Sequence, residues 1–466
     1  MRLKKITLNN YRCFENLEVD LHPKLTVLVG ENGSGKTAIL DAIATGLSPL
    51  LRYLSSANQR LSGPGIKDTD FRIASLPERG NRQRWGTTDY AQVIMETMSG
   101  MEWDNWRPSA ADRQQANKIG QTSLSNYAKG ILESFKTDSP ELLPIFAYYG
   151  AQRGTIEIPE RLRPSSQEYS QPTSALVGAL DAQSDFKELL KWFDIEEATE
   201  LRVNKGYKPE DFELSVALET VRNAIESIFA SKYKNPYFNK DHKFVVTQEN
   251  GMPLQVSQLS QGYQSMLALA MDFARRLAIG NSHLTFDNLH QYPIQQSLFD
   301  FSVSEFPENF RSPSLLAPGI MLIDEIDLHL HPSWQQRVIN DLMRTFPNTQ
   351  FIVTTHSPQV LSTVHRESIR LLGKDENGRD VATMPLAESY GEISSDVLES
   401  IMHVNPQPPI GEREKLERLT ELVDQGQYNI PEATSLFAEL KSVLDETHPQ
   451  LQKLARSIQR QELLKR

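Results

Sequence analysis

Gly30-Glu31-Asn32-Gly33-Ser34-Gly35-Lys36-Thr37 matches the pattern GxxxxGK[ST]. The apolar run 25–29 precedes it, and apolar residues at helical spacing follow it at positions 39, 40, 43 and 47. Strand, glycine-rich loop and helix therefore occur in the order that a phosphate-binding loop requires, which a chance glycine-rich turn would not need. The sequence predicts an α/β fold that carries a P-loop.

Most residues of this octapeptide have an expected role in binding ATP. Glycines at 30, 33 and 35 allow backbone conformations in which successive N–H groups point at phosphate oxygens, and the following helix adds its positive end. Lys36 should neutralise the β- and γ-phosphates, and Thr37 should offer its hydroxyl to Mg²⁺. The expected ATP contacts in this loop are Gly30, Asn32, Gly33, Ser34, Gly35, Lys36 and Thr37.

A second motif supplies acidic groups. The apolar run 320–323 is followed directly by Asp324 and Glu325. A carboxylate at the end of a buried strand can hold Mg²⁺, so Asp324 is the expected metal ligand, and Glu325 is expected to orient or deprotonate the attacking water. The alternative is an ordinary strand end with two solvated acids, which the phosphate loop makes the weaker interpretation.

Composition places limits on the class of protein. The chain has 466 residues, which is enough for two or three domains, and its net charge is −11. This acidic balance argues against broad coating of nucleic acid, although a local basic patch could still hold a duplex. The single cysteine, Cys13, cannot form an internal disulfide, which favours a reducing, cytoplasmic compartment. No apolar window approaches the length that spans a bilayer, so we expect no membrane insertion.

The hydrophobic pattern suggests how the chain is divided. We expect an ATPase head formed by residues 1–50 and 243–385, interrupted by inserted segments. The insertions are a polar, irregular lobe at 51–140, a strand at 141–155 and a helical lobe at 156–242; helices are expected at 386–466. Leucines in this last region fall at helical spacing beside many charges, which makes it the candidate contact for a partner protein.

Together these motifs resemble the ABC-type ATPase heads of the SMC/RecF/OLD group. The run from Met321 to Pro332, followed by Thr354-Thr355-His356-Ser357-Pro358, is most similar to the Septu-type anti-phage defence ATPases (PtuA), which also occur beside retrons. The interval 38–258 is too irregular for the long coiled coil of chromosome-maintenance ATPases. About ninety residues follow Leu372, too few for the Toprim domain of OLD nucleases.

The resemblance implies further site residues. Leu259-Ser260-Gln261-Gly262-Tyr263 is similar to the LSGGQ signature, with Gln261 and Tyr263 as departures, and implies that Ser260 and Gly262 cap the γ-phosphate held by a second subunit. Gln152 resembles the glutamine that reaches Mg²⁺ and the attacking water, although an ordinary polar loop residue remains an alternative. His356 resembles the histidine that contacts the γ-phosphate.

The resemblance also implies partners. It implies a homodimer or higher homo-oligomer, joined head to tail around ATP, and a separate HNH-type nuclease subunit similar to PtuB; DNA or retron nucleic acid are further candidates. The alternatives are a RecF-like repair ATPase that needs no nuclease and, less well supported, the motor subunit of a transporter. His329 and His331 have some metal-ligand character, but their positions match a loop at the dimer interface of this group.

Overall fold

The fold is built around apolar runs that become fully buried strands. The computed structural model describes residues 1–56, 59–78, 82–110, 117–154, 171–182, 186–292, 312–445 and 447–464. The chain forms two units, Met1–Val397 and Leu398–Arg466. Two parts of the expected helical lobe, residues 156–170 and 183–185, lie outside the described residues.

A six-stranded sheet forms the centre of the first unit, in the order β15-β14-β3-β13-β12-β8. All neighbouring strands are parallel except the pair β14 and β15. Every residue of β3, β8, β12 and β13 is buried, as in parallel sheets covered on both faces. The strands are β3 (Leu25–Val29), β8 (Ile145–Tyr149), β12 (Gly319–Ile323), β13 (Thr349–Thr354), β14 (Ile369–Lys374) and β15 (Asp380–Thr383).

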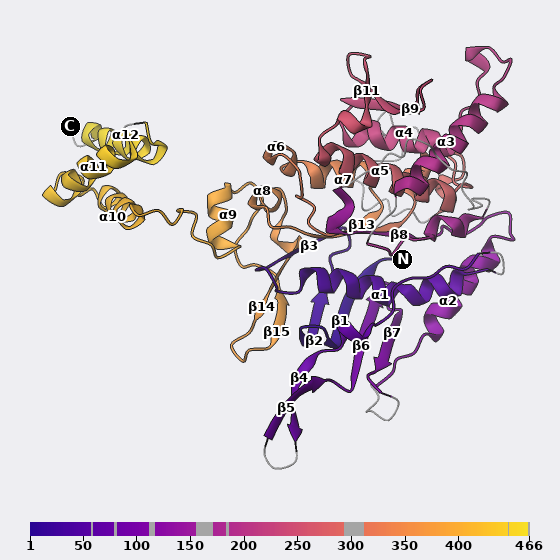
Figure 1. Ribbon diagram of the computed structural model, residues 1–466, viewed down its shortest axis with the longest axis horizontal. Helices are drawn as coiled ribbons and strands as arrows, with labels where there is room; N and C mark the ends of the chain where they lie inside the picture. The colour runs from indigo at the N-terminus through magenta and orange to yellow at the C-terminus, as the bar shows by residue number, and fades with distance from the viewer. Residues whose placement is uncertain are drawn as a thin grey trace. The chain divides into compact units, whose positions relative to one another are not determined.

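Two long helices cover this sheet. Helix α1 (Lys36–Leu54) lies between it and a second sheet, whereas α5 (Gln261–Gly280) lies on the opposite side (Figure 1). The Nε1 atom of Trp103 donates a hydrogen bond of 2.7 Å to the carbonyl of Gly46, which joins the second sheet to α1. A Cβ at Gly46 would lie 2.6 Å from Sδ of Met95, so a larger residue there would force the Met95 side chain to move.

The second sheet corrects the expectation of an irregular lobe at 51–140. It is antiparallel, in the order β2-β1-β6-β7, and a hairpin of β4 and β5 follows α1 in the chain. Residues Ala91, Val93 and Met95 are buried at alternate positions, a strand pattern masked by the surrounding polar residues. The strands are β1 (Leu3–Tyr11), β2 (Phe14–Asp20), β4 (Ile73–Glu78), β5 (Arg82–Thr87), β6 (Tyr90–Thr97) and β7 (Glu102–Pro108).

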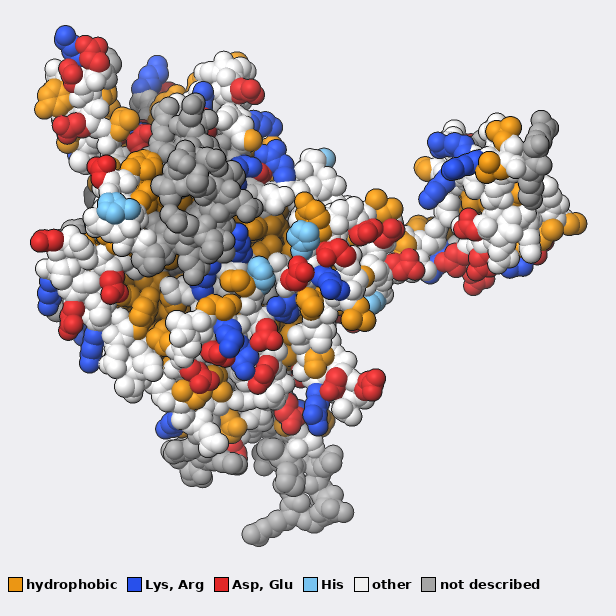
Figure 2. Space-filling view, turned by 180° about the vertical axis from the view of Figure 1, so that it is seen from behind, with side chains coloured by type: hydrophobic (Ala, Val, Ile, Leu, Met, Phe, Trp, Pro, Cys, Tyr) orange, Lys and Arg blue, Asp and Glu red, His pale blue; other side chains and the backbone are white. Residues whose placement is uncertain are grey.

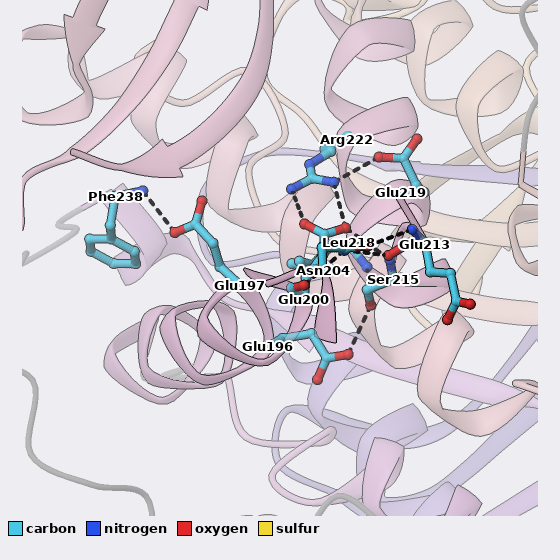
Figure 3. A network of polar contacts seen from close by, with 10 residues as sticks. All are labelled: Glu196, Glu197, Glu200, Asn204, Glu213, Ser215, Leu218, Glu219, Arg222 and Phe238. Carbon is cyan, nitrogen blue, oxygen red and sulfur yellow. Dashed lines mark hydrogen bonds and ion pairs between the residues drawn. The ribbon is translucent and has the colours of Figure 1, made fainter. Parts of the chain in front are cut away.

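The expected helical lobe contains α3 (Phe186–Val203) and α4 (Val216–Ile228), and a polar network fixes the turn between them (Figure 3). Arg222 of α4 bonds both carboxylate oxygens of Glu200 of α3, at 3.1 and 2.8 Å. Asn204 donates to the carbonyls of Glu200 and Glu213. Because these contacts join residues up to 22 positions apart, the two helices form a fixed hairpin.

The remaining elements before residue 401 are short. A three-stranded sheet contains the strand pair predicted around the Asn250-Gly251 turn, with Val246 opposite Leu254. Its strands are β9 (Tyr233–Phe238), β10 (Phe244–Gln248) and β11 (Pro253–Gln255). The helices are α2 (Thr122–Ser134), α6 (Pro332–Gln335), α7 (Val338–Thr345), α8 (Pro358–Leu361) and α9 (Ser394–Ser400). None of the described helices is long and apolar enough to cross a bilayer.

The second unit corrects the expectation for the C-terminal leucines. Its helices are α10 (Arg413–Asp424), α11 (Pro431–Leu444) and α12 (Pro449–Leu464). The predicted stripe Leu416, Leu419, Leu422 and Val423 is buried in the core that the three helices share. An apolar stripe that packs within its own bundle is not available to a partner, so any contact there must use the outer faces of the helices.

Candidate ATP-hydrolysing site

The phosphate loop joins β3 to α1 in the predicted order. Gly33 and Gly35 have positive φ angles of 83° and 91°, a conformation that side chains disfavour. A Cβ on Gly35 would lie 2.3 Å from the ring of Phe14, so the loop also packs too closely for any side chain there. Ser34 Oγ is buried and has no hydrogen-bond partner among the described residues, which fits a loop shaped for a polar ligand.

The Lys36 side chain is hydrogen-bonded to the phosphate loop. Its ammonium group donates to the carbonyls of Gly30 and Glu31, at 2.9 and 2.8 Å. Burial lowers the pKa of Lys36, while the negative charges of Asp324 and Glu325 act in the opposite direction. A triphosphate would supply anionic acceptors in place of the two carbonyls and would favour the charged form of the lysine.

The two motifs meet through hydroxyl groups. Thr37 Oγ1 donates to Asp324 Oδ2 at 2.9 Å, across 287 positions of the sequence. Thr354 Oγ1, at the end of β13, donates to Asp324 Oδ1 at 2.6 Å. A threonine hydroxyl beside a carboxylate provides the hard oxygen ligands that Mg²⁺ prefers, so these residues fit the predicted metal site. Sequence reasoning included Thr354 in the run that resembles the Septu-type ATPases but gave it no role at the site.

Glu325 has an unusual backbone conformation. Its φ angle is +49°, in the left-handed region that is unfavourable for residues with a Cβ. Glu325 N donates to Thr354 Oγ1 at 2.7 Å, and the next amide, Ile326 N, donates to the Thr354 carbonyl at 3.0 Å. Strained backbone that is held in this way occurs often at functional sites.

Arg153 was not identified as a site residue from the sequence. It lies in the turn after β8, beside Gln152, and only 4% of its surface is exposed. Its guanidinium donates to the carbonyls of Asp324 and Glu325, the second at 2.6 Å. Burial lowers its pKa to about 10, so the group remains charged at neutral pH. The sequence signal that could have identified Arg153 as a site residue is its position directly after Gln152.

The predicted signature motif begins α5. Ser260 is the N-cap residue, yet its exposed side chain accepts no capping hydrogen bond. Gly262 is buried, and a Cβ there would lie 2.4 Å from the carbonyl oxygen of His329, in the turn that follows Glu325. Tyr263 packs on Trp334, with ring centroids 4.4 Å apart, which gives this departure from LSGGQ a structural role.

The other predicted residues lie at the same edge of the sheet. Gln152 is exposed in the turn after β8, and the half-buried His356 follows β13. The His356 backbone N–H donates to Asp327 Oδ1 at 3.3 Å, and this oxygen also accepts from Thr355 Oγ1 at 2.6 Å. Within the part of the chain that the structure describes, no three His, Cys, Asp or Glu side chains are grouped to hold a metal ion.

A P-loop, an acidic strand end and a largely parallel sheet define a P-loop ATPase head. Residues 5–233 match the family described as AAA domain, and residues 133–362 match AAA domain, putative AbiEii toxin, Type IV TA system. The solved SMC head bound to the C-winged helix domain of ScpA is 14% identical, with a TM-score of 0.40, and covers 82% of this chain and 97% of its own.

Curated relatives make the family more specific. The retron Ec83 probable ATPase of Escherichia coli is 31% identical over 94% of this chain and 83% of that protein. The retron Vc95 probable ATPase of Vibrio cholerae serotype O1 biovar El Tor is 27% identical over 92% of this chain and 84% of that protein. The Septu protein PtuA of Bacillus mycoides is 28% identical over 37% of this chain and 20% of that protein. The chain belongs to the family of the retron Ec83 probable ATPase, and it is an ATPase.

The packing around Gly35 leads to a prediction. Gly35→Ala should lower the free energy of unfolding by at least about 1 kcal/mol, because alanine disfavours a φ of +91° and its Cβ would clash with Phe14. Chemical denaturation would measure this, with Gly65→Ala as the control, since Gly65 has no atoms within 4 Å of an added Cβ. Equal stability of the two variants would contradict the described loop conformation.

Proposed function

We propose that this ATPase closes into a head-to-tail homodimer around ATP and Mg²⁺, and that closure regulates a separate HNH-type nuclease in anti-phage defence. The observation that carries the proposal is the environment of Ser260. Its hydroxyl is exposed at the start of α5, makes no capping bond there, and belongs to a helix end that attracts anions. The γ-phosphate held by another subunit is the expected occupant.

In this proposal each subunit contributes half of every site. The P-loop with Lys36 binds the phosphates, Thr37 and Asp324 hold Mg²⁺, and bound Mg²⁺ neutralises charge that develops on the phosphates. Glu325 accepts a proton from the attacking water, while Gln152 and His356 contact the water and the γ-phosphate. Because Gly262 packs on the turn that follows Glu325, a ligand at Ser260 is coupled to the hydrolytic turn of the same subunit.

A nuclease partner is supported by kinship with the retron and Septu ATPases and by the surface that the chain leaves for a partner. The C-terminal three-helix unit buries the leucine stripe of α10 and presents charges, including Arg418, which pairs with Glu432 at 2.7 Å. Charged faces of this kind favour a polar, salt-sensitive contact. On the face in Figure 2, basic and acidic side chains are interspersed, so any nucleic-acid contact would be local.

Co-expression with an HNH-type nuclease encoded beside this gene tests the partner proposal. We expect the two proteins to co-purify, and cleavage of DNA by the complex to change by about fivefold or more when ATP is added. No association, or cleavage that ignores ATP, would contradict the proposal. If DNA instead stimulates ATP hydrolysis with no nuclease bound, a RecF-like repair function would replace it.

A further inference from the structure

Arg153 is a buried cation with no carboxylate partner in any hydrogen bond that the structure gives it. Among the residues that the structure describes, its guanidinium bonds to backbone carbonyls only: Gly150 at 3.2 Å, in its own turn, and Asp324 and Glu325 on the neighbouring segment. Burying a guanidinium is costly, and the lowered pKa of Arg153 reflects this desolvation. A purely structural contact between two turns could be made by a neutral group at lower cost.

The two carbonyls that Arg153 binds lie on either side of the Cα atom of Glu325. The Asp324 carbonyl and Glu325 N belong to one peptide group, and the Glu325 carbonyl and Ile326 N belong to the next. Thr354 binds both N–H groups, at 2.7 and 3.0 Å, and Arg153 binds both carbonyls. The φ angle of +49° at Glu325 is therefore restrained from both sides, by Thr354 and by Arg153.

Restraining these peptide groups fixes the direction in which the Glu325 side chain leaves the backbone. That side chain is half-buried, and none of the hydrogen bonds that the structure gives holds its carboxylate. Its aim must then come from the backbone, and a free Glu325 would relax toward negative φ, which would redirect its Cβ. Small displacements of a catalytic group are expensive, about a hundredfold in rate for about 1 Å.

We propose that Arg153 is a positioning residue that holds Glu325 in its strained conformation and so aims the carboxylate at the attacking water. The inference rests on the role given to Glu325 under the proposed function. Arg153 follows Gln152 directly, so a movement of that turn would reach Glu325 through two hydrogen bonds. Arg153 itself is buried and contacts backbone, so it acts through Glu325 and not on phosphate.

Arg153→Lys is the first test, because lysine keeps the charge but presents one point donor where arginine spans two carbonyls. We expect kcat for ATP hydrolysis to fall by about ten- to a hundredfold, with KM for ATP within about twofold of the parent value. Arg344→Lys is the matched control: Arg344 also donates to a backbone carbonyl, that of Ser227 at 2.7 Å, but lies on α7. That variant should retain the parent kcat.

The double variant with Glu325→Gln separates the possible explanations. If Arg153 acts through Glu325, adding Arg153→Lys to Glu325→Gln should leave the residual single-turnover rate unchanged. A further fall in that rate, a rise in KM that matches the loss of kcat, or a parent-like Arg153→Lys would each overturn the proposal. Should Arg153→Lys not fold, Arg153→Gln provides the same comparison with a neutral donor. Parent-like turnover by Glu325→Gln alone would instead contradict the role of Glu325.

Discussion

Glu325→Gln should reduce the rate of ATP hydrolysis by about a hundredfold or more while the protein still binds ATP. Glutamine has the same shape, so the backbone contacts of Thr354 and Arg153 remain, but its amide cannot accept a proton from the attacking water. Binding depends mainly on Lys36 and the loop amides, which this substitution does not touch. ATP-bound dimers should therefore accumulate.

Single-turnover hydrolysis, ATP binding and light scattering on the same preparation would measure these effects. Glu376→Gln is the matched control, because Glu376 is exposed in the turn between β14 and β15 and far in sequence from either motif. It should leave both the rate and the mass unchanged. If Glu325→Gln hydrolyses ATP at the parent rate, another group is the base, and the acidic pair serves only the metal.

Sequence alone identified the site residues that belong to short, contiguous motifs. The P-loop and the pair Asp324-Glu325 each fit within eight residues, and the flanking apolar runs fixed their place on strands and helix. Thr354 and Arg153 could not be found in this way. Their importance comes from hydrogen bonds to residues 28 or more positions away, which depend on the order β13-β12-β8 in the sheet.

The two corrections have a related origin. The strand β6 was not recognised because Gln92 and Glu96 interrupt its apolar residues and the segment before it is polar. The leucines of α10 were correctly placed on one face of a helix, but periodicity does not identify what covers that face. Here α11 and α12 cover it. Local pattern therefore missed a strand in one case and the packing partners of a helix in the other.

Mixing two inactive variants should restore hydrolysis. Lys36→Ala removes the cation that binds the phosphates, and Ser260→Glu places a carboxylate where the γ-phosphate of the other subunit is expected, so each alone should lose about a hundredfold or more of the activity. Ser260 is exposed and begins a helix, where an acidic side chain is well tolerated, so folding should be preserved.

In a mixed dimer, the subunit with Ser260→Glu still has Lys36, and the subunit with Lys36→Ala still has Ser260, so one composite site is intact and the other carries both defects. With random pairing, half of the dimers are mixed and each has one working site, which predicts recovery of about a quarter of the parent rate. Adding Lys36→Ala to the Ser260→Glu subunit removes the intact site and should abolish recovery. A mixture no more active than its components would show that each subunit completes its own site, and head-to-tail closure around ATP would be wrong.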